Sequence, residues 1–213
     1  MIHSTAQIGI LLGGSIRKEI DVIRLTSRIV SLLCAAMILA SCAGTGATVY
    51  KQSYAALYRQ QEIIAKHYET GVSVDTIGSF AGMSSPDLGQ SVASAMDQHN
   101  EGPPLRFYAR TADNWDKDHH AAVLFQPAPD ALAFKLCEGT AVSSAKGNPN
   151  TALLAYCRYG KPYSDVWVTI PAGARPGDTA FEDAFALATR LLLPVNPEGR
   201  DRCDFNCQQM IGN

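Results

Sequence analysis

Several features that define common protein classes are scarce or missing in this 213-residue sequence. Its 18 Lys and Arg residues are offset by 20 Asp and Glu residues, so it has no excess positive charge with which to bind nucleic acid. It contains neither a G-x-S-x-G nucleophile motif nor a phosphate-binding G-x-x-x-x-G-K-[ST] loop. The long apolar run at 29–39 falls short of the roughly 20 residues that a membrane-spanning helix needs.

The apolar run at 29–39 is preceded by basic residues and followed by small ones. Arg24 and Arg28 precede it, and a basic stretch followed by a short apolar segment is typical of a secretory signal. The run ends in Leu39-Ala-Ser-Cys42, which small residues follow. The segment is therefore interpreted as an export signal and is left out of the predicted fold.

Residues 24–46 resemble the signal sequence of bacterial lipoproteins, in which a Leu and two small residues precede a lipid-carrying Cys. The resemblance implies that Cys42 receives a diacylglyceryl group, that cleavage falls between Ser41 and Cys42, and that the new amino terminus is acylated. Because Ala43 is not Asp, it also implies a lipid-anchored place in the cell envelope, at the outer membrane and facing the periplasm. The alternative is a plain cleavable signal with a chance cysteine.

The sequence divides into four parts on this interpretation. Residues 1–41 are an upstream extension and signal peptide that is removed, and the true start is hypothesised near Val22. Residues 42–48 form a lipidated tether of small residues. Residues 49–195 form a single domain, and 196–213 are a polar tail. From Cys42 onward the chain carries 14 Lys and Arg against 18 Asp and Glu, which describes a mildly acidic body.

Apolar periodicity predicts an α+β domain. Residues spaced by three and four indicate helices, whereas alternation with a period of two indicates strands. Segment 72–84 is expected to be irregular. The predicted helices are 48–70, Ser85 to about His99, and Thr179 to Pro194; the predicted strands are 105–110, 121–126, 132–137, 152–158 and 164–170, with 141–145 as a further short candidate. Short links between strands favour an antiparallel sheet of about four to six strands, with N-terminal helices and a C-terminal helix packed on it.

Four cysteines remain after cleavage and lipidation: Cys137, Cys157, Cys203 and Cys207. An even number in an exported chain favours two disulfides. If strands 132–137 and 152–158 paired directly, the first two cysteines would lie too far apart, so a strand at 141–145 is expected between them. The favoured pairing is Cys137–Cys157 with Cys203–Cys207. A tail that reaches back to the sheet and a Cys₄ zinc site are the alternatives.

The most polar cluster of the sequence lies at 113–120. It offers metal candidates in Asp116, Asp118, His119 and His120, but the spacing fits no established metal motif, and neighbouring histidines diverge on a strand. Metal binding is therefore considered unlikely, and no cofactor is expected.

No catalytic constellation is visible, so the favoured interpretation is a non-catalytic lipid-anchored protein that binds or braces a periplasmic partner, such as an envelope protein. Two alternatives stay open. One is a lipid-anchored hydrolase whose site is assembled from distant residues, and the other is a metal- or ligand-binding module that uses the 113–120 loop.

Overall fold

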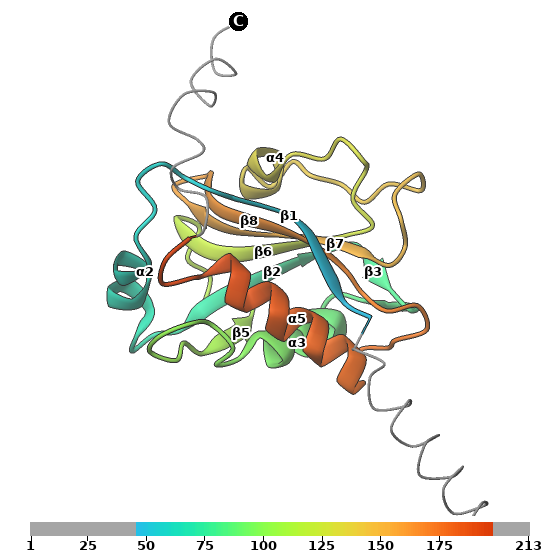
Figure 1. Cartoon of the computed structure of the whole chain (residues 1–213), viewed down its shortest axis with the longest axis horizontal. Helices are drawn as coiled ribbons and strands as arrows, with labels where there is room; N and C mark the ends of the chain where they lie inside the picture. The colour runs from blue at the N-terminus through green and yellow to red at the C-terminus, as the bar shows by residue number, and fades with distance from the viewer. Residues whose placement is uncertain (1–45, 198–213) are drawn as a thin grey trace, which may run out of the picture. The chain divides into compact units, whose positions relative to one another are not determined.

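Six strands form one mixed sheet in the computed structural model, which describes residues 46–197 (Figure 1). Across the sheet the strand order is β1-β8-β7-β6-β2-β5. Their bounds are β1 Thr48–Tyr54, β2 Val72–Ile77, β5 Phe107–Ala109, β6 His119–Phe125, β7 Thr151–Arg158 and β8 Lys161–Thr169. Two further short strands, β3 (Ser79–Phe80) and β4 (Met83–Ser84), pair only with each other.

The four described helices lie around this sheet. They are α2 (Gln60–His67), α3 (Asp87–Met96), α4 (Ala133–Cys137) and α5 (Thr179–Leu192). Helices α3 and α5 lie on one side of the sheet and α4 lies on the other, while α2 lies at one end (Figure 1). None of the described helices is long and apolar enough to cross a membrane.

Each face of the sheet has its own hydrophobic core. The larger core joins α3 and α5 to the strands, and its largest members include Phe125, Phe181 and Phe185. The smaller one packs Leu136 of α4 on side chains such as Leu153 and Trp167. Because β7 is covered on both faces, its residues from Thr151 to Cys157 are all buried, which explains its nearly uninterrupted apolar sequence.

The α+β composition and the six-stranded sheet agree with the prediction, but the sheet is mixed and not purely antiparallel. Strands β1, β8, β7 and β6 are antiparallel neighbours, whereas β2 runs parallel to both β5 and β6. Parallel neighbours require a crossover, and α3 provides it between β2 and β5. The short links between the strands predicted after β5 suggested hairpins. Because β2 was not predicted, the crossover from β2 to β5 was not expected either.

The prediction of a helix at 48–70 is wrong over its first part, because 48–54 forms β1 at the sheet edge. Tyr50, Tyr54 and Tyr58 recur at a helical spacing of four, but aromatic and β-branched residues also favour strands. Pairing with β8 decides between the two, and the helix α2 begins only at Gln60. Segment 72–84, expected to be irregular, contains β2, whose Val72 and Val74 are fully buried.

The predicted strand at 132–137 is also wrong, because 133–137 forms the helix α4. Leu132 and Phe134 are exposed while the consecutive residues Leu136 and Cys137 are buried, which one helical turn allows and a strand does not. Segment 141–145 forms no strand. It is held instead by side-chain contacts such as the Ser143 hydroxyl, which donates to the Phe125 carbonyl at 2.7 Å.

Candidate functional site

A groove of about 700 Å³ opens at the end of the sheet where β2 and β6 begin. One wall is the segment before β6, and the other is the end of α2 with the turn that leads into β2. Its lining residues are Lys66, His67, Thr70, Gly71, Ser73 and the six residues of 113–118. The groove is of the size that small-molecule sites usually have.

The wall at 113–118 is an ordered turn because its own side chains satisfy its backbone. The Asn114 side-chain oxygen accepts a hydrogen bond from the Thr111 N–H at 2.7 Å, and its amide donates to the Ala109 carbonyl at 2.9 Å. Asp116 Oδ1 accepts from the N–H groups of Asp118 and His119, at 2.9 and 3.1 Å. Asn and Asp make such local bonds readily, so this sequence holds a fixed loop without regular structure.

An ion pair joins the two walls of the groove. Lys66 Nζ of α2 lies 3.0 Å from Asp116 Oδ2 of the loop. Burial acts to raise the pKa of Asp116, but Lys66 and the two backbone N–H donors outweigh it and hold that pKa below its ordinary value. Asp116 therefore stays ionised and fixes the loop against α2.

Behind the ion pair, His67 is buried in a chain of hydrogen bonds. Its Nδ1 lies 2.7 Å from the carbonyl oxygen of Gly71, so Nδ1 is the protonated nitrogen that donates. Its Nε2 lies 2.9 Å from the Tyr156 hydroxyl, which donates to it when the ring is neutral. Burial lowers the pKa of His67, so the neutral ring is the form present near pH 7.

His119 and His120 lie on opposite faces of β6, as expected of neighbours on a strand. His119 lies on the α2 side, where its Nδ1 is 3.9 Å from Asp116 Oδ2 and its ring packs against Tyr159 at 4.7 Å. His120 is only 4% exposed and is paired across the sheet with Cys157. The two imidazoles therefore cannot serve one site together.

Three side chains enclose His120 on its own face. The Trp115 ring lies 4.4 Å from the His120 ring, and the Arg110 guanidinium lies 4.0 Å from the Trp115 ring. Arg110 in turn pairs with Asp75 of β2 at 2.9 Å. These contacts link the loop, β2 and β6, and they place the Trp115 indole at the wall of the groove.

Of the four predicted metal candidates, the structure brings together only Asp116 and His119. Asp118 lines the groove, and His120 faces the other side of the sheet. Among residues 46–197 no three His, Cys, Asp or Glu side chains gather as a metal site would require.

The sequence pattern indicated the wall of the groove at 113–118 but not the wall formed by α2 and the start of β2. Lys66, His67 and Ser73 lie about 40 to 50 residues before the loop, and nothing in their spacing points to it. Their position depends on β2 lying beside β6, which is the parallel pairing that the sequence did not indicate.

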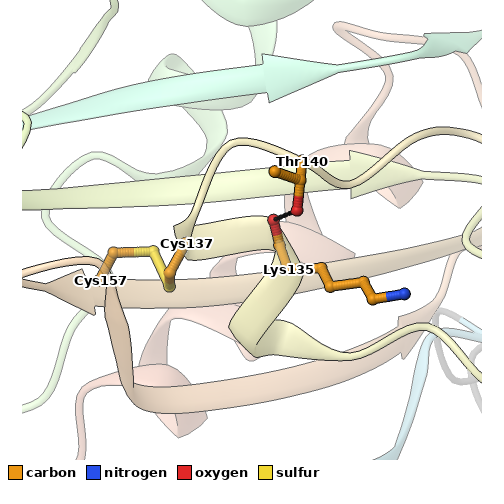
Figure 2. The surroundings of a disulfide bond; sticks show 4 residues. All are labelled: Lys135, Cys137, Thr140 and Cys157. Carbon is orange, nitrogen blue, oxygen red and sulfur yellow. Dashed lines mark hydrogen bonds between the residues drawn. A yellow bond between two sulfur atoms is a disulfide. The ribbon is translucent and has the colours of Figure 1, made fainter.

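The predicted bond between Cys137 and Cys157 is present, with a Cα–Cα distance of 5.3 Å (Figure 2). The reason differs from the expected one, because α4 and not an intervening strand brings Cys137 over β7. Figure 2 also shows the Thr140 hydroxyl donating to the Lys135 carbonyl just after this helix. Cys42, Cys203 and Cys207 lie outside the described residues.

The buried histidines make the fold sensitive to acid. Burial lowers the pKa of His67, His119 and His120. In the unfolded chain a histidine has a pKa of about 6.5. Below that pH the unfolded state binds protons that the folded state does not yet bind. The free energy of unfolding that these neutral histidines contribute is therefore fully present above about pH 6.5 and is lost as the pH falls. We expect the urea midpoint to be lower at about pH 5 than at about pH 7.5.

A substitution series separates this effect from the titration of carboxylates. His67→Gln should flatten the dependence of the urea midpoint on pH, because it removes one buried imidazole. His99→Gln removes an exposed imidazole and is the matched control. Equal slopes in the parent and in His67→Gln would contradict the assignment.

The groove presents hydrogen-bonding groups and charges of both signs on a fixed frame. Ser73 lines the groove but its Oγ is fully buried, and neither this oxygen nor His120 Nδ1 has a hydrogen-bond partner among the described residues. No nucleophile–base hydrogen bond therefore exists between Ser73 and His120. A comparison of the chain with protein-family models, curated proteins and solved structures finds no match.

Proposed function

We propose that this protein is anchored in the cell envelope by lipid on Cys42, faces the periplasm, and acts without chemistry of its own by binding an envelope component in the groove. The lipoprotein-like segment at 24–46 supports the anchor. Among residues 46–197, Ser73 Oγ and His120 Nδ1 form no hydrogen bond, so these two groups make no nucleophile–base pair, which favours binding over hydrolysis.

The observation that carries the binding proposal is the ordered groove itself. The Lys66–Asp116 pair and the side-chain bonds within 111–119 hold its walls in place before any ligand arrives. A preformed site loses little conformational entropy on binding, which favours recognition. Lys117 and Asp113 are exposed at the same wall and make no ion pair among residues 46–197, so their charges are available to an incoming component.

Site-specific photo-crosslinking tests this proposal in intact cells. With p-benzoyl-phenylalanine in place of Lys117, we expect illumination to give a discrete adduct of higher mass. The matched control carries the same residue in place of Lys146, which is also exposed and lies in the loop beyond the opposite end of β6. The measurement is the ratio of adduct to free protein at the two positions.

The outcome is decisive in both directions. An adduct at position 117 that is absent at 146 supports binding in the groove, whatever the component is. Adducts at neither position, or equally at both, would remove the groove as the binding site. Digestion of the adduct with a protease or with a glycan hydrolase then identifies the class of component.

A further inference from the structure

A patch of apolar and basic side chains lies beside the groove, around the hairpin that joins β7 to β8. Two large apolar side chains in it face solvent, because Leu57 is 76% exposed and Tyr159 is 65% exposed. Two exposed cations, Arg59 and Lys161, and the half-buried Arg158 complete the set. We call these five residues the hairpin patch.

One tyrosine holds the two segments of the hairpin patch together. The Tyr163 hydroxyl accepts a hydrogen bond from the Arg59 N–H at 2.8 Å and donates one to the Leu57 carbonyl at 2.7 Å. The Arg158 guanidinium lies 5.1 Å from the centre of the Tyr163 ring, and Lys161 is paired with Arg158 across the hairpin. The segment before α2 and the hairpin therefore form one surface, although they are far apart in the sequence.

The hairpin patch is basic although the body as a whole is acidic. Residues 46–197 carry 12 Lys and Arg against 15 Asp and Glu. The patch holds three of these cations, and the ion pairs of the described residues use only Arg158, which pairs with Glu62. Arg59 and Lys161 thus present charge that a complementary acidic surface can neutralise.

The hairpin patch is continuous with one wall of the groove. The Tyr159 N–H donates a hydrogen bond to the Asp118 carbonyl at 2.7 Å, and the Tyr159 ring packs against the His119 ring at 4.7 Å. Asp118 lines the groove. A component that fills the groove and extends beyond this wall therefore covers the patch as well.

The shape of the patch favours a large partner. The recess that Arg158, His119 and Tyr163 help to line holds only about 40 Å³, whereas small-molecule sites usually hold several hundred. Tyr and Arg side chains are among those that protein interfaces are rich in. A protein surface laid over the patch fits these observations better than a small ligand does.

The groove favours a protein over a polymer of uniform negative charge. A nucleic acid or an anionic membrane would be attracted by the patch, but the carboxylates of Asp113 and Asp118 on the neighbouring wall would repel it. A protein carries charge of both signs, so it can place carboxylates on the patch and cations on the wall.

We propose, on the basis of the binding function above, that the component bound in the groove is a protein with an acidic surface that also covers the hairpin patch. Leu57 and Tyr159 make the apolar contacts of this interface. Arg59 and Lys161 pair with Asp or Glu side chains of the partner.

Photo-crosslinking from the patch tests this inference in intact cells. With p-benzoyl-phenylalanine in place of Tyr159, an aromatic residue replaces an aromatic one, and we expect a discrete adduct that protease destroys. The matched control carries the same residue in place of Phe134, an exposed aromatic on α4. The measurement is the ratio of adduct to free protein at the two positions.

Charge reversal in the chain that carries the crosslinker at 159 tests the acidic character of the partner. Arg59→Glu with Lys161→Glu should reduce the adduct ratio at least about tenfold, because two attractions become repulsions. Arg59→Lys with Lys161→Arg keeps both charges and should keep the adduct. Both double variants should melt like the parent, since neither residue forms an ion pair among the described residues.

Mass spectrometry of the adduct identifies the partner's crosslinked segment, which should contain Asp or Glu residues. Changing these to Lys in the partner should restore the adduct of the Arg59→Glu, Lys161→Glu chain. Such a charge swap is expected only if the two surfaces face each other.

Four results would overturn the inference: no adduct at 159, equal adducts at 159 and 134, an adduct that resists protease, or a ratio that charge reversal leaves unchanged. A protease-resistant adduct that phospholipase removes would assign the patch to the membrane instead. If position 117 gives its adduct while 159 gives none, the acidic-partner assignment fails and the binding function stands. Adducts at neither 117 nor 159 would remove both.

Discussion

The Cys42→Ser variant should leave the membrane fraction and lose its acyl mass. Each buried methylene of a lipid chain contributes roughly 0.8 kcal/mol, and two or more chains hold a protein stably on a bilayer. Serine has no thiol to carry the diacylglyceryl group, so this contribution vanishes. Detergent phase partition and intact-mass spectrometry measure the change, and we expect the protein to move from the detergent phase to the aqueous phase.

Cys34→Ser is the matched control for this experiment. Cys34 lies eight residues upstream, within the apolar run and outside the Leu39–Cys42 motif. Its substitution should leave acylation and partition unchanged. A Cys42→Ser protein that stays in the detergent phase, or a parent chain that begins upstream of Cys42 without acyl mass, would refute the anchor.

Removal of the Cys137–Cys157 bridge should lower the free energy of unfolding by about 3 kcal/mol. The bridge closes a loop of 20 residues, and the entropy of such a loop in the unfolded chain gives this magnitude. Helix α4 has five residues, too few to be stable alone, and only Leu136 and Cys137 of it are buried. In a domain of about 150 residues the melting temperature should fall by roughly 6 to 12 °C.

The two single variants and the double variant together identify the cause. Cys137→Ala, Cys157→Ala and the double substitution each break the same bond, so the three losses should be nearly equal. Losses that add would mean that each cysteine stabilises the fold through its own packing and that the bridge contributes little. Calorimetry without reducing agent is the measurement, because a reductant would also act on any other disulfide.

Where packing followed a regular apolar pattern, the sequence was a sufficient guide to the fold. The stripe that contains Phe181, Phe185 and Ala188 predicted α5, and these side chains are fully buried. Strands β7 and β8 were predicted for a similar reason. The first strand was not, because Thr48–Tyr54 is mostly exposed and gains its structure by pairing with β8. Its residues carry little information about that partner.

The candidate site shows the same division between local and long-range information. The polar loop at 113–120 was visible as a cluster, and the divergence of His119 and His120 followed from strand geometry. The contribution of Lys66 and Ser73 was not visible, because a parallel pairing far along the chain brings them to the loop. The sequence therefore indicated the wall of the groove at 113–118 but not the opposite wall, which the end of α2 and the start of β2 form.

If Cys42 carries lipid, the direction of β1 separates the groove from the end of the domain where the lipidated segment enters it. Six peptide units join Cys42 to Thr48, so with Cys42 lipidated the strand starts within about 20 Å of the bilayer surface. From there β1 runs to Tyr54, which pairs with Ser164 at the same end of the sheet as the start of β6. The groove end of the sheet thus lies one strand length, roughly 20 Å, from the Thr48 end of β1. In a lipid-anchored molecule, the groove and the entry of the tether would therefore lie at opposite ends of the sheet.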